Sequence, residues 1–330
     1  MNAPPPDDDL FASLLGAIPE AERSKVLRMA EIKKKYLRSP RDKPVREGID
    51  HLLKQAIETK DSKEIEGRIF AVLGESGAGK SASIRQALDQ VVKDLGGGAA
   101  KRIVRVNAPS PCTMRLLGKE ALEQLGYRPE RNLRENEYWD LVRVQIKRQR
   151  PLIVWIDELQ HCTNALRSED ELQKLCDTLK LLIQQPHWPP VSLILSGLPS
   201  LADFVEHDDQ ILRRTSILLV EPIAFPADVP TLRRLIVEIV GNHAGMEISP
   251  SIDTDEFLHR LCHASGNAFG LAVCLTRDAV AKALGAGDQA VEARHFEAAY
   301  ASVARNGAPN IFTAAVWTGV RTWYRKPKEE

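Results

Sequence analysis

A glycine-rich octapeptide has residue types and spacing that can bind phosphate. It follows the pattern G-x-x-x-x-G-K-[ST] and comprises Gly74, Glu75, Ser76, Gly77, Ala78, Gly79, Lys80 and Ser81. Glycines let the backbone curl so that successive N–H groups point at phosphate oxygens, and a following helix adds the positive end of its dipole. Lys80 is expected to reach the outer phosphates, and the Ser81 hydroxyl to ligate Mg²⁺. A chance match is disfavoured because an apolar run precedes the loop and a helical pattern follows it.

Two carboxylates end another apolar run, Leu152–Ile156, further along the chain. We expect Asp157 to hold Mg²⁺ through water and Glu158 to polarise the attacking water as a general base. Alone, the pair would be solvated acids at a strand end. Beside the phosphate loop, it predicts an ATPase that uses ATP and Mg²⁺ as cofactors. Most kinases and GTPases need no second carboxylate here, so the pair favours hydrolysis.

Further polar residues stand at the ends of the next apolar runs. Ser196 follows Val191–Leu195 and is the candidate sensor between the acids and the γ-phosphate, although an ordinary strand-to-turn serine remains the alternative. Arg213 and Arg214 precede Ile217–Val220, where an arginine finger offered to a neighbouring subunit's nucleotide would lie. Plain solvated charges are the alternative for this pair, and the choice between the two arginines stays open.

The elements that must position these residues are apolar runs of strand length between longer amphipathic stretches. The runs are Arg68–Leu73, Ile103–Val106, Leu152–Ile156, Val191–Leu195 and Ile217–Val220. Strands separated by helical patterns predict a parallel sheet covered on both faces. Beyond Glu221 we expect no further strands. The helices expected there are Leu232–Val240, Phe257–Ala264, Leu271–Leu284 and Phe296–Val303.

The expected fold class is therefore α/β, with a P-loop parallel sheet core covered by helices. A small C-terminal helical lid follows this core, and a basic helical N-terminal extension precedes it. The expected domains are a disordered start and extension at 1–46, the ATPase core at 47–225, the lid at 226–303 and a tail at 304–330. Disorder is expected at residues 2–9, which are rich in Pro and Asp. The helical extension is expected to break near Ser39-Pro40, because the residue before proline disfavours the helical region.

Bulk composition limits the classes of function. The 330 residues include 45 Lys and Arg and 45 Asp and Glu, so any contact with nucleic acid must come from local clusters rather than a global field. The five cysteines form no CxxC pair and indicate reduced thiols. The acidic, proline-rich start is unlike a signal peptide, and no run approaches the roughly 18 apolar residues that span a bilayer. We expect a cytoplasmic protein with no membrane partner.

The order of loop, acidic strand, sensor, arginine pair and helical lid resembles the AAA+ ATPase superfamily over residues 47–300. Within AAA+, several short segments look like the TniB/TnsC group of transposition ATPases. They are Asn107-Ala108-Pro109, Leu116-Leu117 with Ala121-Leu122 and Leu125–Pro129, Ser196–Leu201, Ser265–Leu271 and the basic start from Ile18 to Pro40. Some of these segments are shared with secretion ATPases of the ExeA type. One departure is Gly270, which stands without an arginine where many AAA+ lids carry a second sensor arginine.

This resemblance implies a function. TniB/TnsC-like proteins oligomerise with ATP on double-stranded DNA as rings or filaments, and they link a target-selection protein or complex to a transposase. The chain is thus expected to be an ATP-dependent, DNA-binding regulator of transposition, and the lid's missing arginine suggests slow, regulatory hydrolysis. The alternatives are an ExeA-like or helicase-loader-like motor and a signalling ATPase, none of them involved in transposition.

DNA contacts in such a protein are expected to go to the phosphate backbone, through lysine and arginine. Three basic clusters are candidates, and each could instead be a solvated face. They are Lys33–Lys43, then Lys101, Arg102, Arg105 and Lys119, then Lys147, Arg148 and Arg150. The segment after the second strand is preferred, since the family's contacts come from loops that face the ring's pore.

Two further features have competing interpretations. The tail, Trp317–Lys326, mixes aromatic and basic residues and either docks on a partner or anchors itself on the lid. His259, Cys262 and His263 have metal-like spacing, but they lie in an ordinary amphipathic helical pattern with no second pair of ligands, so a metal site is disfavoured.

Overall fold

The computed structural model describes residues 8–63, 65–96, 98–165, 168–184, 187–304 and 307–322. Most of the segment expected to be disordered, residues 2–9, lies outside these ranges; Asp8 and Asp9 instead begin helix α1 (Asp8–Ala17). The chain divides into two compact units. Within the described ranges, the first unit holds residues 41–76 and 80–221, and the second holds 8–40, 77–79 and 222–322.

The first unit is built on a five-stranded sheet whose order is β2-β3-β4-β1-β5 and whose paired strands are all parallel. The strands are β1 (Ile69–Gly74), β2 (Ile103–Asn107), β3 (Ile153–Asp157), β4 (Ser192–Gly197) and β5 (Thr215–Val220). Each corresponds to one of the five apolar runs. The expected α/β fold class is confirmed.

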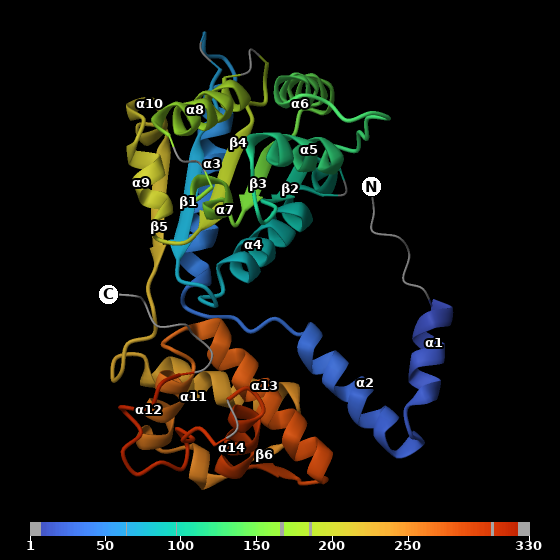
Figure 1. The fold of residues 1–330 in the computed structure, drawn as a ribbon, viewed down its shortest axis with the longest axis vertical. Coiled ribbons are helices and arrows are strands. Elements are labelled where there is room, and N and C mark those ends of the chain that lie inside the picture. Colours follow the sequence, from blue (N-terminus) through green and yellow to red (C-terminus); the bar gives the residue numbers. More distant parts are fainter. Residues whose placement is uncertain are drawn as a thin grey trace. The chain divides into compact units, whose positions relative to one another are not determined.

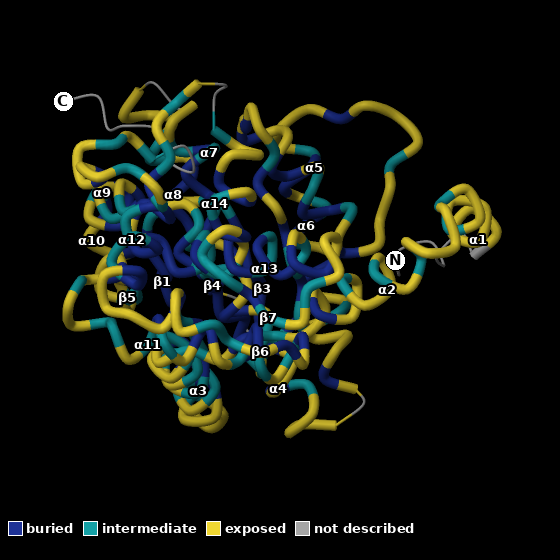
Figure 2. The backbone as a smooth tube through the Cα atoms, turned by 90° about the horizontal axis from the view of Figure 1, so that it is seen from below, coloured by how far each residue is buried: buried dark blue, intermediate teal, exposed yellow. Residues whose placement is uncertain are grey.

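Helices cover both faces of this sheet (Figure 1). One face carries α5 (Met114–Gln124), α6 (Glu135–Gln149) and α8 (Glu169–Ile183), and the other carries α3 (Asp42–Glu58) and α4 (Lys80–Leu95). The shorter helices of the unit are η1 (Ala99–Arg102), α7 (Gln160–Thr163), α9 (Leu201–Glu206) and α10 (Asp209–Leu212). Because both faces are covered, β1, β3 and β4 are buried along their whole length. Figure 2 shows dark blue, buried backbone beside the β1 label.

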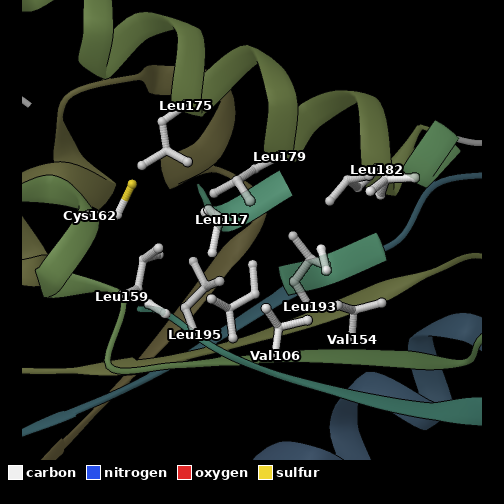
Figure 3. Packing of buried hydrophobic residues seen from close by; sticks show 14 of the residues in the cluster. Val106, Leu117, Val154, Leu159, Cys162, Leu175, Leu179, Leu182, Leu193 and Leu195 are labelled. Carbon is white, nitrogen blue, oxygen red and sulfur yellow. The ribbon is translucent and has the colours of Figure 1, made fainter. Parts of the chain in front are cut away.

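Alternating side chains along the strands fill two different layers. On one face, Leu175, Leu179 and Leu182 of α8 pack over side chains from β2, β3 and β4 (Figure 3). On the other face, Phe70 of β1 points at α3, where a Cβ on Gly48 would lie 2.2 Å from the Phe70 ring. The glycine in the middle of α3 is therefore explained by close packing on the sheet.

The second unit is mostly helical. It contains α2 (Glu20–Lys34), α11 (Val229–Ile236), α12 (Asp255–Ala264), α13 (Phe269–Ala286) and α14 (Ala293–Ala301), with a π-helical segment η2 (Val237–His243) after α11 and a short 3-10 helix η3 (Pro250–Ile252). The expectation of no strands beyond Glu221 is wrong, because β6 (Glu247–Ile248) and β7 (Ala290–Val291) form a small parallel pair. Two-residue strands carry too little sequence pattern to be recognised.

The basic N-terminal segment is part of this second unit. Ile32 and Leu37 are buried in the same core as α11 to α14. Lys25 donates to the carbonyl of Gly285 at 3.0 Å and Lys35 to that of His243 at 3.2 Å, and Arg28 donates to the carbonyl of Ala244. These carbonyls lie at helix ends, where the dipole is negative and cations are favoured. In the described part of the chain, no helix combines the length and apolar character needed to cross a membrane.

Candidate active site

The phosphate loop joins the end of β1 to the start of α4, as the sequence predicts. Gly77 and Gly79 have φ angles of 78° and 95°, in the left-handed region that residues with a Cβ rarely adopt. Open space surrounds the position of a Cβ on Gly79, so backbone conformation rather than crowding requires glycine there. The loop is therefore curled in the way that phosphate binding needs.

Lys80 is the first residue of α4, and only 6% of it is exposed. Its Nζ donates to the carbonyl oxygens of Gly74 at 2.8 Å and Glu75 at 3.0 Å. Burial lowers the pKa of Lys80, and the negative charges of Glu158, Asp157 and Glu75 oppose this shift. A buried ammonium that donates to carbonyls and is partly compensated by acids is ready to accept an anion.

Asp157 is the centre of the site and is 3% exposed. Its Oδ1 accepts hydrogen bonds from Ser196 Oγ at 2.7 Å, from Ser81 Oγ at 3.0 Å and from the backbone N–H of Glu158 at 3.1 Å. Ser196 Oγ in turn accepts from Trp155 Nε1 at 2.8 Å. Thus the structure brings together three of the predicted residues, Ser81, Asp157 and Ser196, from α4, β3 and β4.

The donor set at this centre suits magnesium. A serine hydroxyl and a carboxylate are hard oxygen ligands of the kind that Mg²⁺ prefers, and they already lie 3.0 Å apart. Mg²⁺ keeps several of its waters and is usually held by one or two protein groups plus phosphate oxygens. Ser81 and Asp157 therefore fit the expected metal.

Glu158 directly follows β3 and has a left-handed backbone with a φ of 58°, which is uncommon for a residue with a side chain. Its Oε2 accepts a hydrogen bond from Gln160 Nε2, and Gln160 Oε1 accepts from the N–H of Leu198 at 3.2 Å. The buried Gln160 thus connects the candidate base to the loop after β4. Sequence reasoning missed this glutamine, because its link between Glu158 and Leu198 depends on where the loop after β4 lies.

Arg105 is a second residue that sequence reasoning placed differently. The sequence groups it with a candidate DNA-binding cluster, whereas its Nη2 donates to Asp157 Oδ2 at 3.1 Å. Its guanidinium carbon lies 4.4 Å from the ring centre of Trp155, in cation–π range. Arg105 therefore contacts the acidic strand, because the register of β2 against β3 pairs Arg105 with Trp155.

Arg213 and Arg214 lie apart from the other site residues. They come just before β5, whose first residue is aligned with the first residue of β1. The phosphate loop follows the last residue of β1, so the arginines lie at the opposite end of this strand from the loop. Arg214 Nε donates to Glu66 Oε1 at 2.6 Å, and Arg213 Nε donates to the carbonyl of Asp209 at 3.1 Å. Together with Arg68 and Gln210 they line an open cavity of about 380 Å³.

The basic clusters have different environments. In the first cluster, Lys34 pairs with Glu31 and Lys35 binds the His243 carbonyl. The second and third clusters meet at one end of the sheet, where Arg102 Nη1 donates to the carbonyl of Arg150 at 3.0 Å. We call the exposed cations at this end the basic edge; they are Lys101, Arg102, Lys147, Arg148 and Arg150. Among the described residues, no carboxylate forms an ion pair with any of these five.

The histidines of α12 pack against aromatic rings. His259 stacks on Phe225 at 3.9 Å between ring centres, and both His259 and His263 contact the ring of Trp317. His263 Nε2 is 2.9 Å from the carbonyl oxygen of Val320. Trp317 is 9% exposed, so the described part of the tail packs on α12. Trp323 and the basic residues after it lie outside the described residues.

These geometries define a class of protein. A sequence-family model described as an AAA domain matches residues 64–205, a range that contains the phosphate loop, Asp157 and Ser196. The parallel sheet with its phosphate loop after β1 and acids after β3 is the core fold of AAA+ ATPases. Residues 64–205 are thus similar to an AAA domain. No curated protein matches the sequence significantly.

Solved structures give more particular likenesses. The ORC1 protein of Aeropyrum pernix in complex with DNA is 19% identical, with a TM-score of 0.58 over 82% of this chain and 67% of that chain. Cdc6p from Pyrobaculum aerophilum is 15% identical, with a TM-score of 0.57 over 84% and 71%. The ORC2 protein of A. pernix, solved as ADPNP–ADP complexes, is 13% identical, with a TM-score of 0.54 over 85% and 73%. At these identities the likeness shows a shared fold.

Proposed function

We propose that this protein is an ATPase that regulates DNA transposition. With ATP and Mg²⁺ it oligomerises on duplex target DNA and links target selection to a transposase. The observation that carries the nucleotide part is the convergence of Ser81 and Ser196 on Asp157 beside Lys80. The TniB/TnsC-like segments support the transposition part. The likeness to an ORC1 protein solved with DNA and an ORC2 protein solved with ADPNP and ADP supports the two ligands.

In this proposal the site residues have separate roles. Lys80 exchanges its two carbonyl partners for outer phosphate oxygens, which removes much of the cost of burying its charge. Ser81 and Asp157 would hold Mg²⁺, which when bound neutralises charge on the phosphate oxygens. Glu158 accepts a proton from the attacking water, and Gln160 orients the Glu158 carboxylate through its hydrogen bond. Ser196 links the state of the γ-phosphate to Asp157.

The arginine pair is proposed to act on the nucleotide of a neighbouring subunit. The six residues of β1 separate the arginine end from the loop end by roughly 17 Å, at about 3.3 Å per residue, so neither arginine reaches the chain's own phosphate loop. Arg213 is the better candidate for the finger because Arg214 is committed to Glu66. Arg213 is exposed, and among the described residues its guanidinium donates through Nε to a backbone carbonyl.

DNA is proposed to bind through phosphate contacts at the basic edge. One of its members, Arg150, has a left-handed backbone with a φ of 49° at the end of α6. Glycine adopts this conformation at a lower free-energy cost than arginine does. A residue that is conformationally costly at its position indicates that its side chain has another use. The five cations of the basic edge are exposed. They can neutralise the phosphate backbone of DNA without any contact to the nucleotide bases.

Hydrolysis is proposed to be slow, so that ATP acts as a switch for assembly. The lid carries Gly270 where a second sensor arginine would support turnover. Residues 47–225 would act as the ATPase core and 226–303 as the lid. A motor or loader with the same core would instead show brisk turnover on DNA without stable filaments.

The test is electron microscopy of the protein on duplex DNA with Mg²⁺ and a non-hydrolysable ATP analogue. Wild type is expected to form rings or filaments along the duplex. Lys80→Ala should abolish nucleotide binding and assembly, while Lys93→Ala, an exposed lysine on the same helix, should behave as wild type. Glu158→Gln with ATP itself should trap assembled complexes. Free monomers in every condition, or normal assembly of Lys80→Ala, would contradict the proposed function.

A further inference from the structure

Arg105 is held in an unusual way for a residue on the edge strand β2. Its Nη2 binds Asp157 Oδ2 at 3.1 Å and its guanidinium lies over the ring of Trp155. Its Nε is buried and has no hydrogen-bond partner among the described residues, which is unfavourable for a polar group removed from water. An apolar residue would cover Trp155 without this cost, so the charge itself has a use at this position.

The two oxygens of Asp157 are used differently. Oδ1 accepts from Ser196, from Ser81 and from the backbone N–H of Glu158, which fills its acceptor capacity. Among the described residues, Arg105 is the one hydrogen-bond donor to Oδ2. The oxygen that remains for a water of the metal ion is therefore the oxygen that carries the guanidinium.

We propose that Arg105 is a positioning residue that sets how much Mg²⁺ the site needs, because its guanidinium and a magnesium-bound water compete for Asp157 Oδ2. This inference rests on the proposed binding of ATP with Mg²⁺. Without the metal, Arg105 holds the carboxylate and keeps the site nearly neutral. A metal ion held by Ser81 and Asp157 would compete with Arg105 for this oxygen.

The signs of the effects follow from charge. Removing one positive charge beside Asp157 makes the site more negative, which strengthens the binding of a divalent cation and weakens the binding of bare ATP. A purely structural role predicts the opposite for the metal: without Arg105, Asp157 would lose its orientation and Mg²⁺ would bind more weakly. The direction of the change in Mg²⁺ affinity therefore separates the two roles.

The experiment titrates Mg²⁺ into the full-length protein with a fluorescent ATP analogue, and it measures binding of the analogue in EDTA separately. For Arg105→Gln we expect the Mg²⁺ midpoint to fall by at least about tenfold, a change of about 1.4 kcal/mol, and binding in EDTA to weaken, because a positive charge beside the site is lost. Arg105→Lys keeps the charge and should stay near the wild-type midpoint. Lys93→Gln is the control, because Lys93 is an exposed cation in the last turn of α4, at the opposite end of that helix from Lys80.

A raised or unchanged Mg²⁺ midpoint in Arg105→Gln overturns the inference while leaving the proposed function intact, because wild type still binds the analogue. Failure of wild type to bind the analogue with Mg²⁺ overturns both. Arg105→Met is the second uncharged variant if Arg105→Gln does not fold, because its unbranched stem still covers Trp155.

Discussion

The hydrogen bond between Trp155 and Ser196 allows a quantitative test of the site's construction. Trp155 is 1% exposed and Ser196 is fully buried, so neither partner can turn to bulk water when the other is removed. Ser196→Ala deletes one hydrogen bond to a charged group, Asp157, worth about 1.5–3 kcal/mol, and leaves the Trp155 N–H unsatisfied at about 1–3 kcal/mol. Asp157 keeps three other donors, so we expect a total cost of about 2–4 kcal/mol in the free energy of unfolding.

Trp155→Phe removes the donor together with part of the ring. This single change is expected to cost about 1–3 kcal/mol, because a large buried side chain is reduced and the contact with Arg105 weakens. In the double variant no unsatisfied indole N–H remains, since both partners of the bond are gone. The double variant should therefore be more stable than the sum of the single effects predicts, by about 1–2 kcal/mol.

The assay is urea unfolding of the nucleotide-free protein, followed by circular dichroism, for wild type, both single variants and the double variant. Equal slopes against urea across the four proteins are required before the energies are compared. Ser83→Ala is the control, since Ser83 Oγ donates to Asp42 Oδ1 at 2.8 Å and shares no hydrogen-bond partner with Trp155. Additivity of Trp155→Phe and Ser196→Ala within about 0.5 kcal/mol would refute the reasoning.

Three other predictions concern buried groups. Burial lowers the pKa of Lys80, so between the lowered pKa and the ordinary pKa near 10.4 the unfolded chain binds more protons than the folded chain. Wild type should therefore gain stability relative to Lys80→Met as the pH rises through this window, and urea unfolding at several pH values measures the difference. Ile32→Ala should destabilise the second unit by about 2–5 kcal/mol in thermal unfolding, whereas Val26→Ala, at an exposed position of the same helix, should stay within about 0.5 kcal/mol. A thiol reagent at mildly alkaline pH should modify the exposed Cys274 well before Cys176, whose pKa burial raises to about 12, and equal rates would contradict this.

Much of the first unit could be predicted because its signals are local. Each strand is an apolar run bounded by polar residues, and the phosphate loop needs glycines at fixed positions, two of which have left-handed backbones. The convergence of Ser81, Asp157 and Ser196 also follows from local facts. In a parallel sheet the carboxyl ends of the strands lie at one edge, so residues that end β3 and β4 must meet the loop that follows β1.

The parts that could not be predicted depend on long-range register and on helix ends far away in the sequence. Gln160 looks like any polar residue at a helix start until the loop after β4 is placed beside it. The parallel pair β6 and β7 joins residues some forty positions apart through only two residues each, so nothing periodic marks it. Lys25 and Lys35 bind carbonyls more than two hundred residues away, which no local pattern encodes.

Positive charge is the feature that sequence alone interprets least well, because its meaning depends on what the side chain meets. Lys35 stabilises the end of a helix, Arg105 binds the central acid of the site, and Arg214 pairs with Glu66. Arg105 and Arg214 would each lose an ion pair by turning to a DNA phosphate, so both are poor candidates for that contact. The cations of the basic edge lose no ion pair, which is why phosphate binding is assigned to them rather than to the densest basic stretch of the sequence.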